Sequence, residues 1–166
     1  AGGRGVDALI LTHLHLDHVG GVARLLEEEI PIQKAYIPEG AEDALPDPQA
    51  LEVLAMLRQR GIPIETLARG DVLKSPRTTL TVLWPRPGTV RPGQDANHSS
   101  LAAYLDLQGV SLLTTGDLTG AYEAYTAPRA DILKVSHHGS AGSTGGAYLQ
   151  AVSPQAALLS CAGSRG

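Results

Sequence analysis

The sequence contains little cysteine and no long apolar run, and each absence excludes a class of protein. Cys161 is the only cysteine among 166 residues, so neither an internal disulfide nor a zinc site built from thiolates can form. No stretch of about 18 consecutive apolar residues is present, which excludes a membrane-spanning helix within this sequence. The sequence also has no signal-peptide pattern, so it contains no recognisable targeting signal.

Composition and length predict one soluble globular domain. Hydrophobic residues make up 43% of the chain and charged residues 18%, and the length is sufficient for a substantial core. The chain opens almost directly on a strand and stops without a clear end. We therefore expect residues 1–166 to be an incomplete domain excised from a longer protein.

Basic residues concentrate in one segment although the formal net charge of the chain is −4. This basic segment contains Arg58, Arg60, Arg69, Lys74, Arg77, Arg86 and Arg91, opposed only by Glu65 and Asp71. Such a concentration can form a phosphate-facing surface, with scattered solvated charge on loops as the alternative. Arg77 and Arg86 from this segment, together with Lys134, are the candidate substrate-binding residues.

Hydrophobic periodicity predicts strands alternating with helices or turns. Strands are expected over residues 7–12, 34–37, 62–67, 78–84, 99–107, 110–115, 130–135 and 156–160. Helices are expected over residues 22–30, 50–60 and 147–152, and a flexible glycine- and serine-rich connection over 139–146. This order suggests two mixed sheets packed face to face with helices outside.

The most informative stretch is the segment in which His13, His15, Asp17 and His18 follow an apolar strand. His13 and His15 can turn to the same side, because side chains alternate with period 2 at a strand end. Asp17 and His18 come where the chain must turn, so they project from another direction. Imidazole and carboxylate are ligands that divalent zinc, manganese and iron accept. The segment therefore predicts two ligands for one ion and two for a neighbouring ion.

The distribution of histidine supports a shared metal site. All six histidines fall in three clusters, at positions 13-15-18, 98 and 137-138. Histidines in structural roles would be scattered along the chain. Asp117 and His137 each follow an apolar strand, as His13 does, so we expect all of these side chains to converge in one pocket.

The pattern His-x-His-x-Asp-His after an apolar strand resembles the signature of the metallo-β-lactamase superfamily. Three later segments, 97–101, 113–117 and 133–140, are similar to the metallo-hydrolase domain of ComEC-type competence proteins. The resemblance implies an α/β (α+β) fold, an αββα sandwich of two mixed sheets with outer helices, truncated at both ends. The first sheet would then be depleted and would leave an exposed strand edge.

The resemblance also implies roles for the site residues. Asp117 would bridge two divalent ions, zinc or manganese, and His137 would supply the last histidine of the second ion. The implied metal ligands are His13, His15, Asp17, His18, Asp117 and His137. If His98 is not a ligand, the first ion would be weakly held, and the isolated fragment can then be metal-free.

Four further roles complete the predicted site. Asp17 could orient the nucleophile. His138 should point away from His137 if the strand is still extended, which makes it a candidate for substrate contact or proton transfer, with a backbone-bonded histidine as the alternative. Of Asn97 and His98, only one can face the metals. The ComEC-type pattern favours Asn97, whereas the general superfamily pattern favours His98 as a ligand.

The leading functional hypothesis is a two-metal hydrolase of phosphodiesters, because phosphoryl transfer needs positioning and charge neutralisation more than a protein nucleophile. The ComEC-type resemblance implies a nuclease that degrades the non-imported DNA strand during transformation. It would act at the outer face of the cytoplasmic membrane, within a membrane-embedded parent protein. Two alternatives are a phosphoesterase of small or cell-surface substrates such as phosphocholine groups, and a catalytically weak module that guides single-stranded DNA.

Overall fold

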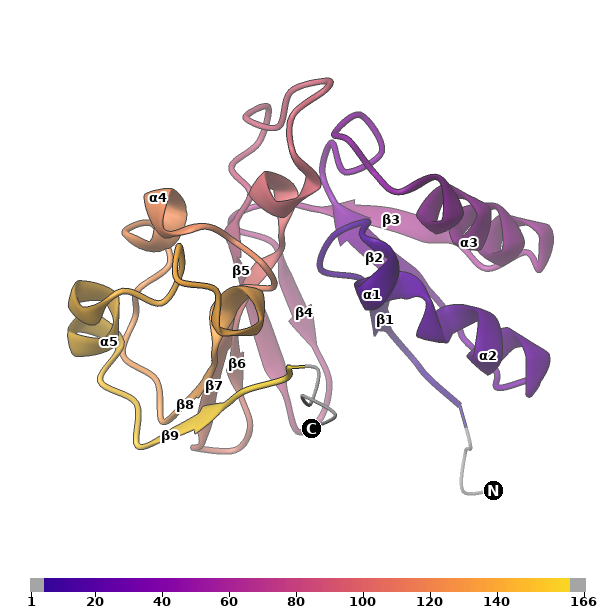
Figure 1. The fold of residues 1–166 in the computed structure, drawn as a ribbon. Coiled ribbons are helices and arrows are strands. Elements are labelled where there is room, and N and C mark those ends of the chain that lie inside the picture. The colour runs from indigo at the N-terminus through magenta and orange to yellow at the C-terminus, as the bar shows by residue number, and fades with distance from the viewer. Residues whose placement is uncertain (1–4, 162–166) are drawn as a thin grey trace, which may run out of the picture.

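The computed structural model describes residues 5–161, which form two sheets with helices on their outer sides (Figure 1). The smaller sheet has three strands and the larger sheet has six among these residues. Apolar side chains from both sheets share one core between them. The predicted α/β sandwich with outer helices is therefore confirmed.

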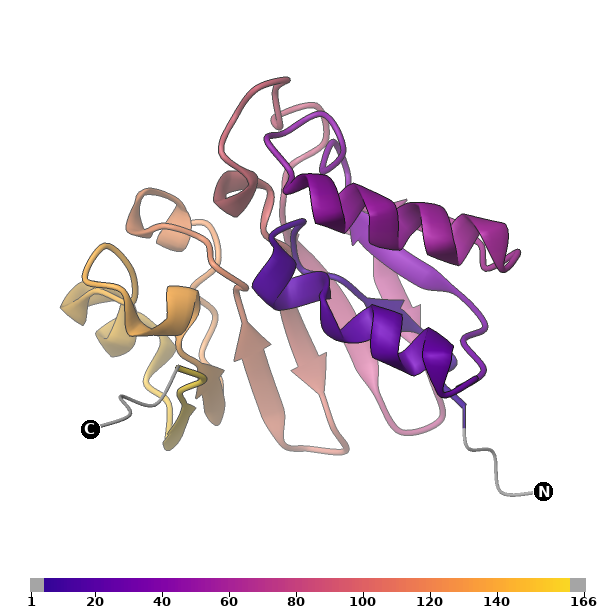
Figure 2. The same cartoon turned by 45° about the vertical axis from the view of Figure 1, so that its right-hand side comes forward.

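The smaller sheet has the strand order β1-β2-β3, and both strand pairs are parallel. Its elements are β1 (Leu9–Ile10), α1 (Leu16–Val19), α2 (Gly21–Glu27), β2 (Ala35–Pro38), α3 (Pro48–Gln59) and β3 (Ile64–Leu67). Parallel neighbours need crossover connections, and the helices supply them while covering the outer face of the sheet (Figure 2). In the described residues, mixed pairing is confined to the larger sheet.

The larger sheet has the strand order β4-β5-β6-β7-β8-β9. Its strands are β4 (Val72–Lys74), β5 (Thr79–Trp84), β6 (Ala102–Asp106), β7 (Ser111–Thr114), β8 (Ile132–Lys134) and β9 (Ala156–Leu158). Pairs are antiparallel from β4 to β7 and parallel from β7 to β9. The connections contain helices α4 (Gly120–Glu123) and α5 (Gly146–Val152) and the 3₁₀ elements η1 (Ala96–Ser99) and η2 (Ser136–Gly139).

Alternation along the strands of the larger sheet fills two separate cores. Leu80 and Val82 of β5 face the smaller sheet, where Tyr36 packs against the same cluster. Leu113 and Leu133 lie on the other face of the sheet, fully buried in a cluster that includes residues of α5. Burial of each such leucine contributes about 1.5–3 kcal/mol, and these two cores fix the relative positions of the strand ends.

The structure differs from the predicted elements in three places. The strand β4 was not predicted, because three residues are too few to show a period, and it pairs Val72 with Thr81 of β5. The helix α4 was also missed for its short length. The residues expected to turn within the histidine motif form helix α1.

Each sheet ends in a strand that has only one partner among the described strands. The predicted open edge of the smaller sheet is β1, which pairs only with β2 among the described strands. At the far edge of the larger sheet, all residues of β9 are exposed, and Leu158 has 55% of its surface accessible. No helix in residues 5–161 combines the length and apolar character needed to cross a bilayer.

Candidate metal centre

The loops that follow β1, β7 and β8 meet at one end of the sandwich. The backbone amide of Leu101 donates to the carbonyl of Thr12 at 2.7 Å, which ties the end of β1 to the start of β6. The amide of His137 donates to the carbonyl of Gly116 at 3.1 Å, which ties the loops after β7 and β8 together. These bonds bring the histidine motif, Asp117 and the histidine pair to a common site.

Four side chains at this site could hold one ion. Asp17, His18, Asp117 and His138 each offer a ligand atom, and these atoms lie within 4.8 Å of one another. His138 Nε2 is 3.2 Å from an oxygen of each aspartate and 3.1 Å from His18 Nε2. His18 Nε2 is 3.3 Å from Asp117 Oδ2. Carboxylate oxygens and imidazole nitrogens at such distances are a donor set for a divalent cation.

The remaining two histidines of the motif lie beside this cluster. His13 Nε2 is 3.2 Å from His15 Nδ1, and the ring of His13 lies 4.1 Å from that of His18 between centroids. Thr12 Oγ1 lies 3.3 Å from Nδ1 of both His13 and His18. Burial, aided by the nearby charge of His18, lowers the pKa of His13 to about 3. His13 is therefore neutral at pH 7, the form in which imidazole binds metals.

Asp117 connects the two groups of histidines. Burial raises its pKa, but the hydrogen bond from His18 and the charges of His18, His13 and His138 outweigh that effect and lower the pKa to about 2. Its backbone amide donates to Ser100 Oγ at 3.0 Å. Its Oδ1 atom is buried with no hydrogen-bond partner among the described residues. A buried, ionised and unpaired carboxylate oxygen is costly, so the residues present fit a bound cation.

The structure corrects the prediction that His137 and His138 point in opposite directions. Both residues belong to η2 and have positive φ angles of 47° and 53°, so the alternation of an extended strand does not apply. His138 Nε2 lies 3.2 Å from Asp117 Oδ2, and His137 Nε2 lies 3.9 Å from the same atom. Both rings thus reach the site, and His138, for which substrate contact or proton transfer is predicted, offers a candidate metal-ligand atom.

The hydrogen bond that His138 makes away from the cluster shows which of its ring nitrogens carries a proton. Its Nδ1 atom lies 2.8 Å from the carbonyl oxygen of Ser160, which can only accept a hydrogen bond. Nδ1 therefore carries a proton, which leaves Nε2 as the ring atom that can bind a metal ion.

Asn97 and His98 are placed differently by η1. Asn97 is buried, and its Oδ1 atom has no partner among the described residues. His98 Nδ1 accepts a hydrogen bond from Gln94 Nε2 at 3.0 Å, and its ring lies 5.2 Å from that of Tyr122. His98 is therefore engaged on the side of the aromatic residues and is absent from the four-residue cluster.

The basic segment does not form one surface. Arg58 lies on α3 and pairs with Glu42 at 2.7 Å. Arg77 lies in the turn between β4 and β5, whereas Arg86 follows the other end of β5. Lys134, at the end of β8, has a buried Nζ atom with no hydrogen-bond partner among the described residues. Neighbours in the sequence are thus distributed over both ends of the molecule.

Three supporting groups at the site were not predicted from the sequence. Thr12 contacts two histidines, Ser100 accepts the amide hydrogen of Asp117, and the carbonyl of Ser160 orients His138. Thr12 could have been found as the residue between the strand and the motif. The other two have no signal in the sequence, because their partners lie 17 and 22 residues away along the chain.

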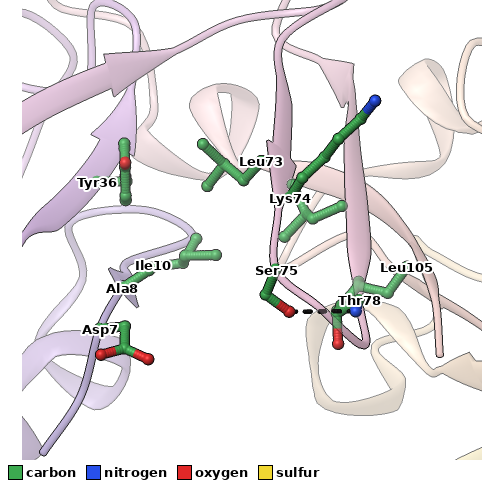
Figure 3. A pocket seen from close by; sticks show the side chains of 10 residues that line it. Asp7, Ala8, Ile10, Tyr36, Leu73, Lys74, Ser75, Thr78 and Leu105 are labelled. Carbon is green, nitrogen blue, oxygen red and sulfur yellow. Dashed lines mark hydrogen bonds between the residues drawn. The ribbon is translucent and has the colours of Figure 1, made fainter.

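A separate cavity lies between the two sheets at the other end of β1 (Figure 3). It has a volume of about 380 Å³ and a largely apolar lining that includes Ile10, Tyr36, Leu73, Leu80 and Leu105. None of the residues of the metal cluster lines this cavity. The candidate metal centre and this cavity therefore lie at different places in the described molecule.

Comparison with known proteins points to one family. The family model described as "Metallo-beta-lactamase superfamily" matches residues 1–163. ComE operon protein 3 of Bacillus subtilis (strain 168) is 36% identical over 160 residues, which cover 93% of this chain. The aligned part spans only 20% of that longer protein.

Solved structures align with the chain at low sequence identity. CmlA, a diiron β-hydroxylase from Streptomyces venezuelae, aligns with a TM-score of 0.53 and 16% identity, covering 80% of this chain and 25% of that chain. Zn²⁺-bound PqqB from Methylobacterium extorquens aligns with a TM-score of 0.47 and 19% identity, covering 76% of this chain and 44% of that chain. The likeness to CmlA extends to the fold alone.

Proposed function

The chain belongs to the metallo-β-lactamase superfamily, and from this premise we propose that it is a metal-dependent phosphodiesterase acting on single-stranded DNA. The observation that carries the proposal is the convergence of imidazole and carboxylate groups on Asp117, whose Oδ1 atom is buried and unpaired. Such a donor set supports binding of divalent cations, and phosphodiester hydrolysis is a reaction that closely placed cations promote.

Two divalent ions, zinc or manganese, are part of this proposal. The first would be held by His13, His15 and Asp117, and the second by Asp17, His18, Asp117 and His138. Bound ions would activate water for attack and neutralise the charge that develops on phosphate oxygens. His138 replaces His137 in this set because its Nε2 atom lies closer to Asp117 and its other nitrogen is fixed by a carbonyl.

The protein side chains have separate tasks in this mechanism. Asp117 is ionised and buried, so it links the two groups of histidines as a fixed negative charge. The side chain of Asp17 is 63% exposed, so it lies at the open side of the cluster, where it can orient an attacking water molecule. Asn97 is buried in η1, and its side-chain amide can hydrogen-bond one of the metal-binding side chains. His137 lies within reach of Asp117 and remains free to contact substrate.

The biological setting is also a proposal. The similarity to ComE operon protein 3 supports a role in DNA uptake, with degradation of the strand that is not imported. This chain spans about a fifth of that relative, so we propose that it works as a domain of a longer membrane protein. The domain would then act at the outer face of the cytoplasmic membrane.

Substitution of Asp117 by asparagine tests the function. Asp117→Asn removes the charge between the two cation positions, so we expect loss of bound metal and of hydrolysis while circular dichroism stays that of the parent chain. Metal content after equilibrium dialysis and cleavage of labelled single-stranded DNA measure the two losses. Full metal content together with near-normal turnover in Asp117→Asn would refute the proposed role of this carboxylate.

The choice of substrate is tested in parallel. The chain loaded with zinc or manganese should cleave single-stranded DNA and bis(p-nitrophenyl) phosphate. Hydrolysis of p-nitrophenyl phosphocholine without cleavage of DNA would instead assign the chain to small or cell-surface substrates.

A further inference from the structure

Half of the few aromatic side chains of the protein lie close together beside the candidate metal centre. It has one tryptophan, five tyrosines and no phenylalanine, and Trp84, Tyr122 and Tyr125 lie together. The ring centroid of Trp84 is 4.9 Å from that of Tyr122 and 5.6 Å from that of Tyr125, and the planes of Trp84 and Tyr125 are stacked at 17°. The guanidinium of Arg86 lies 4.4 Å from the ring centroid of Tyr125. We call these four residues the aromatic platform.

Hydrogen bonds connect this platform to the loops of the metal centre. Trp84 Nε1 donates to the carbonyl of His98 at 2.8 Å, and the ring of His98 packs against Tyr122. η1, which contains His98, leads directly into Ser100, whose hydroxyl accepts the amide hydrogen of Asp117. Tyr122 lies in α4, the helix that follows Asp117 in the chain. The platform therefore borders the metal centre on the side of η1 and α4.

The outer part of the platform is accessible, and its inner part is not. Tyr125 is 45% exposed and Arg86 is exposed, whereas Trp84 is only 5% exposed. Arg86 lies over the ring of Tyr125, and this ring stacks on the buried Trp84. The platform thus presents to solvent a planar cation that is backed by aromatic rings. Aromatic faces stack on nucleobases, and guanidinium groups both stack and attract phosphate.

We propose that Tyr125 and Arg86 form a stacking site for a nucleobase of single-stranded nucleic acid whose backbone passes the metal centre. This inference rests on the proposed function and deepens it. Charge complementarity supports it, because Arg86 adds a cation next to a centre that acts on phosphodiesters. A duplex keeps its bases stacked inside, so the platform selects strands whose bases are free.

Trp84 makes the proposal measurable without any substitution, because it is the only tryptophan of the chain. The metal-free chain is titrated with a short oligothymidylate and, separately, with an abasic oligonucleotide carrying the same number of phosphates. We expect the oligothymidylate to change the fluorescence of Trp84 and to bind about fivefold or more tightly, the range for stacking of one base. Equal affinity and equal fluorescence response for both strands would overturn the proposal.

Variants then assign the preference to the platform. Tyr125→Ala should bring the affinity for oligothymidylate down to that for the abasic strand, and Tyr125→Phe should retain the difference, because its ring still stacks. Arg129→Ala removes an exposed side chain outside the platform, before β8, and as a control it should keep the full preference. A preference that survives in Tyr125→Ala would overturn the assignment.

Failure of the proposed function is distinguishable from failure of the platform. If the metal-loaded chain cleaves no phosphodiester, the proposed function is wrong. The stacking site is judged by the binding preference of the metal-free chain alone. Loss of that preference with intact cleavage of DNA would overturn only the stacking site.

Discussion

The two ends of the sandwich are built in opposite ways although the same strands run between them. At the metal end, backbone hydrogen bonds join loops of both sheets, and ionisable side chains such as His13 and Asp117 are buried. At the cavity end, the sheets separate around about 380 Å³ of largely apolar space (Figure 3). β1 belongs to both, since Ile10 lines the cavity and His13 lies three residues further along. The fold therefore concentrates its buried polar side chains, and the hydrogen bonds between its loops, at one end.

Removal of one histidine from the metal end should have the largest effect on binding. We expect His15→Ala to remove the first ion, because His15 and His13 are its only histidines. His98→Ala should barely change metal affinity, since His98 is held by Gln94 and Tyr122. Calorimetric titration with zinc and with manganese measures both. Equal losses of affinity in the two variants would make His98 a ligand.

Acid should lower the free energy of unfolding of the metal-free chain, because His13 at the metal end must then take up a proton. Burial lowers the pKa of His13 from 6.5 to about 3, so between these values the unfolded state binds more protons than the folded state. The contribution is present in full above about pH 6.5 and is lost as the pH falls toward 3, at about 1.4 kcal/mol per pH unit. Denaturant unfolding at pH 7 and at pH 4.5 should therefore differ by a few kcal/mol.

The variant His13→Gln is the control for this pH dependence. It replaces the titrating ring by a neutral side chain, so its free energy of unfolding should vary less between pH 7 and pH 4.5. An unchanged slope would show that other groups titrate in this window.

Substitution of the two arginines that flank β5 allows the two ends to be compared directly. The expected effect on DNA binding is intermediate in size. β5 is six residues long, so about 20 Å of strand separates the turn of Arg77 from the platform of Arg86. Arg86→Glu should weaken binding of single-stranded DNA about tenfold and flatten its salt dependence. Arg77→Glu should have a smaller effect, as measured by fluorescence anisotropy over a range of salt. Equal effects would mean that DNA contacts both ends.

Filling the cavity should have the smallest effect. Ala8 lines the cavity (Figure 3), so Ala8→Leu can add apolar contacts and raise the free energy of unfolding by about 1 kcal/mol. Ala8→Ser is the control, because it adds a polar atom and little volume. A marked loss of stability in Ala8→Leu would show that the two sheets are packed more rigidly here than the open cavity indicates.

The fold and the gathering of most candidate site residues could be predicted from local patterns. The β-branched and apolar run that forms β5 and the clustering of His13, His15 and His18 are visible in the sequence, because each depends on neighbouring residues. The arrangement of His137 and His138 was not predictable from strand periodicity, since both adopt left-handed backbone conformations. The basic residues do not form one surface, because β5 places Arg77 near one of its ends and Arg86 near the other, so charges close in sequence are separated in space.

The left-handed backbone of η2 has a consequence for motion. His137, His138 and Gly139 have successive φ angles of 47°, 53° and 81°, and a left-handed conformation costs about 1–2 kcal/mol for each non-glycine residue. Bonds from the metal to His138 would offset this cost, so η2 should open more often when the ion is removed. Amide hydrogen exchange at residues 136–140 would then slow on metal addition, and the turn would report occupancy of the centre as a change in its exchange rate.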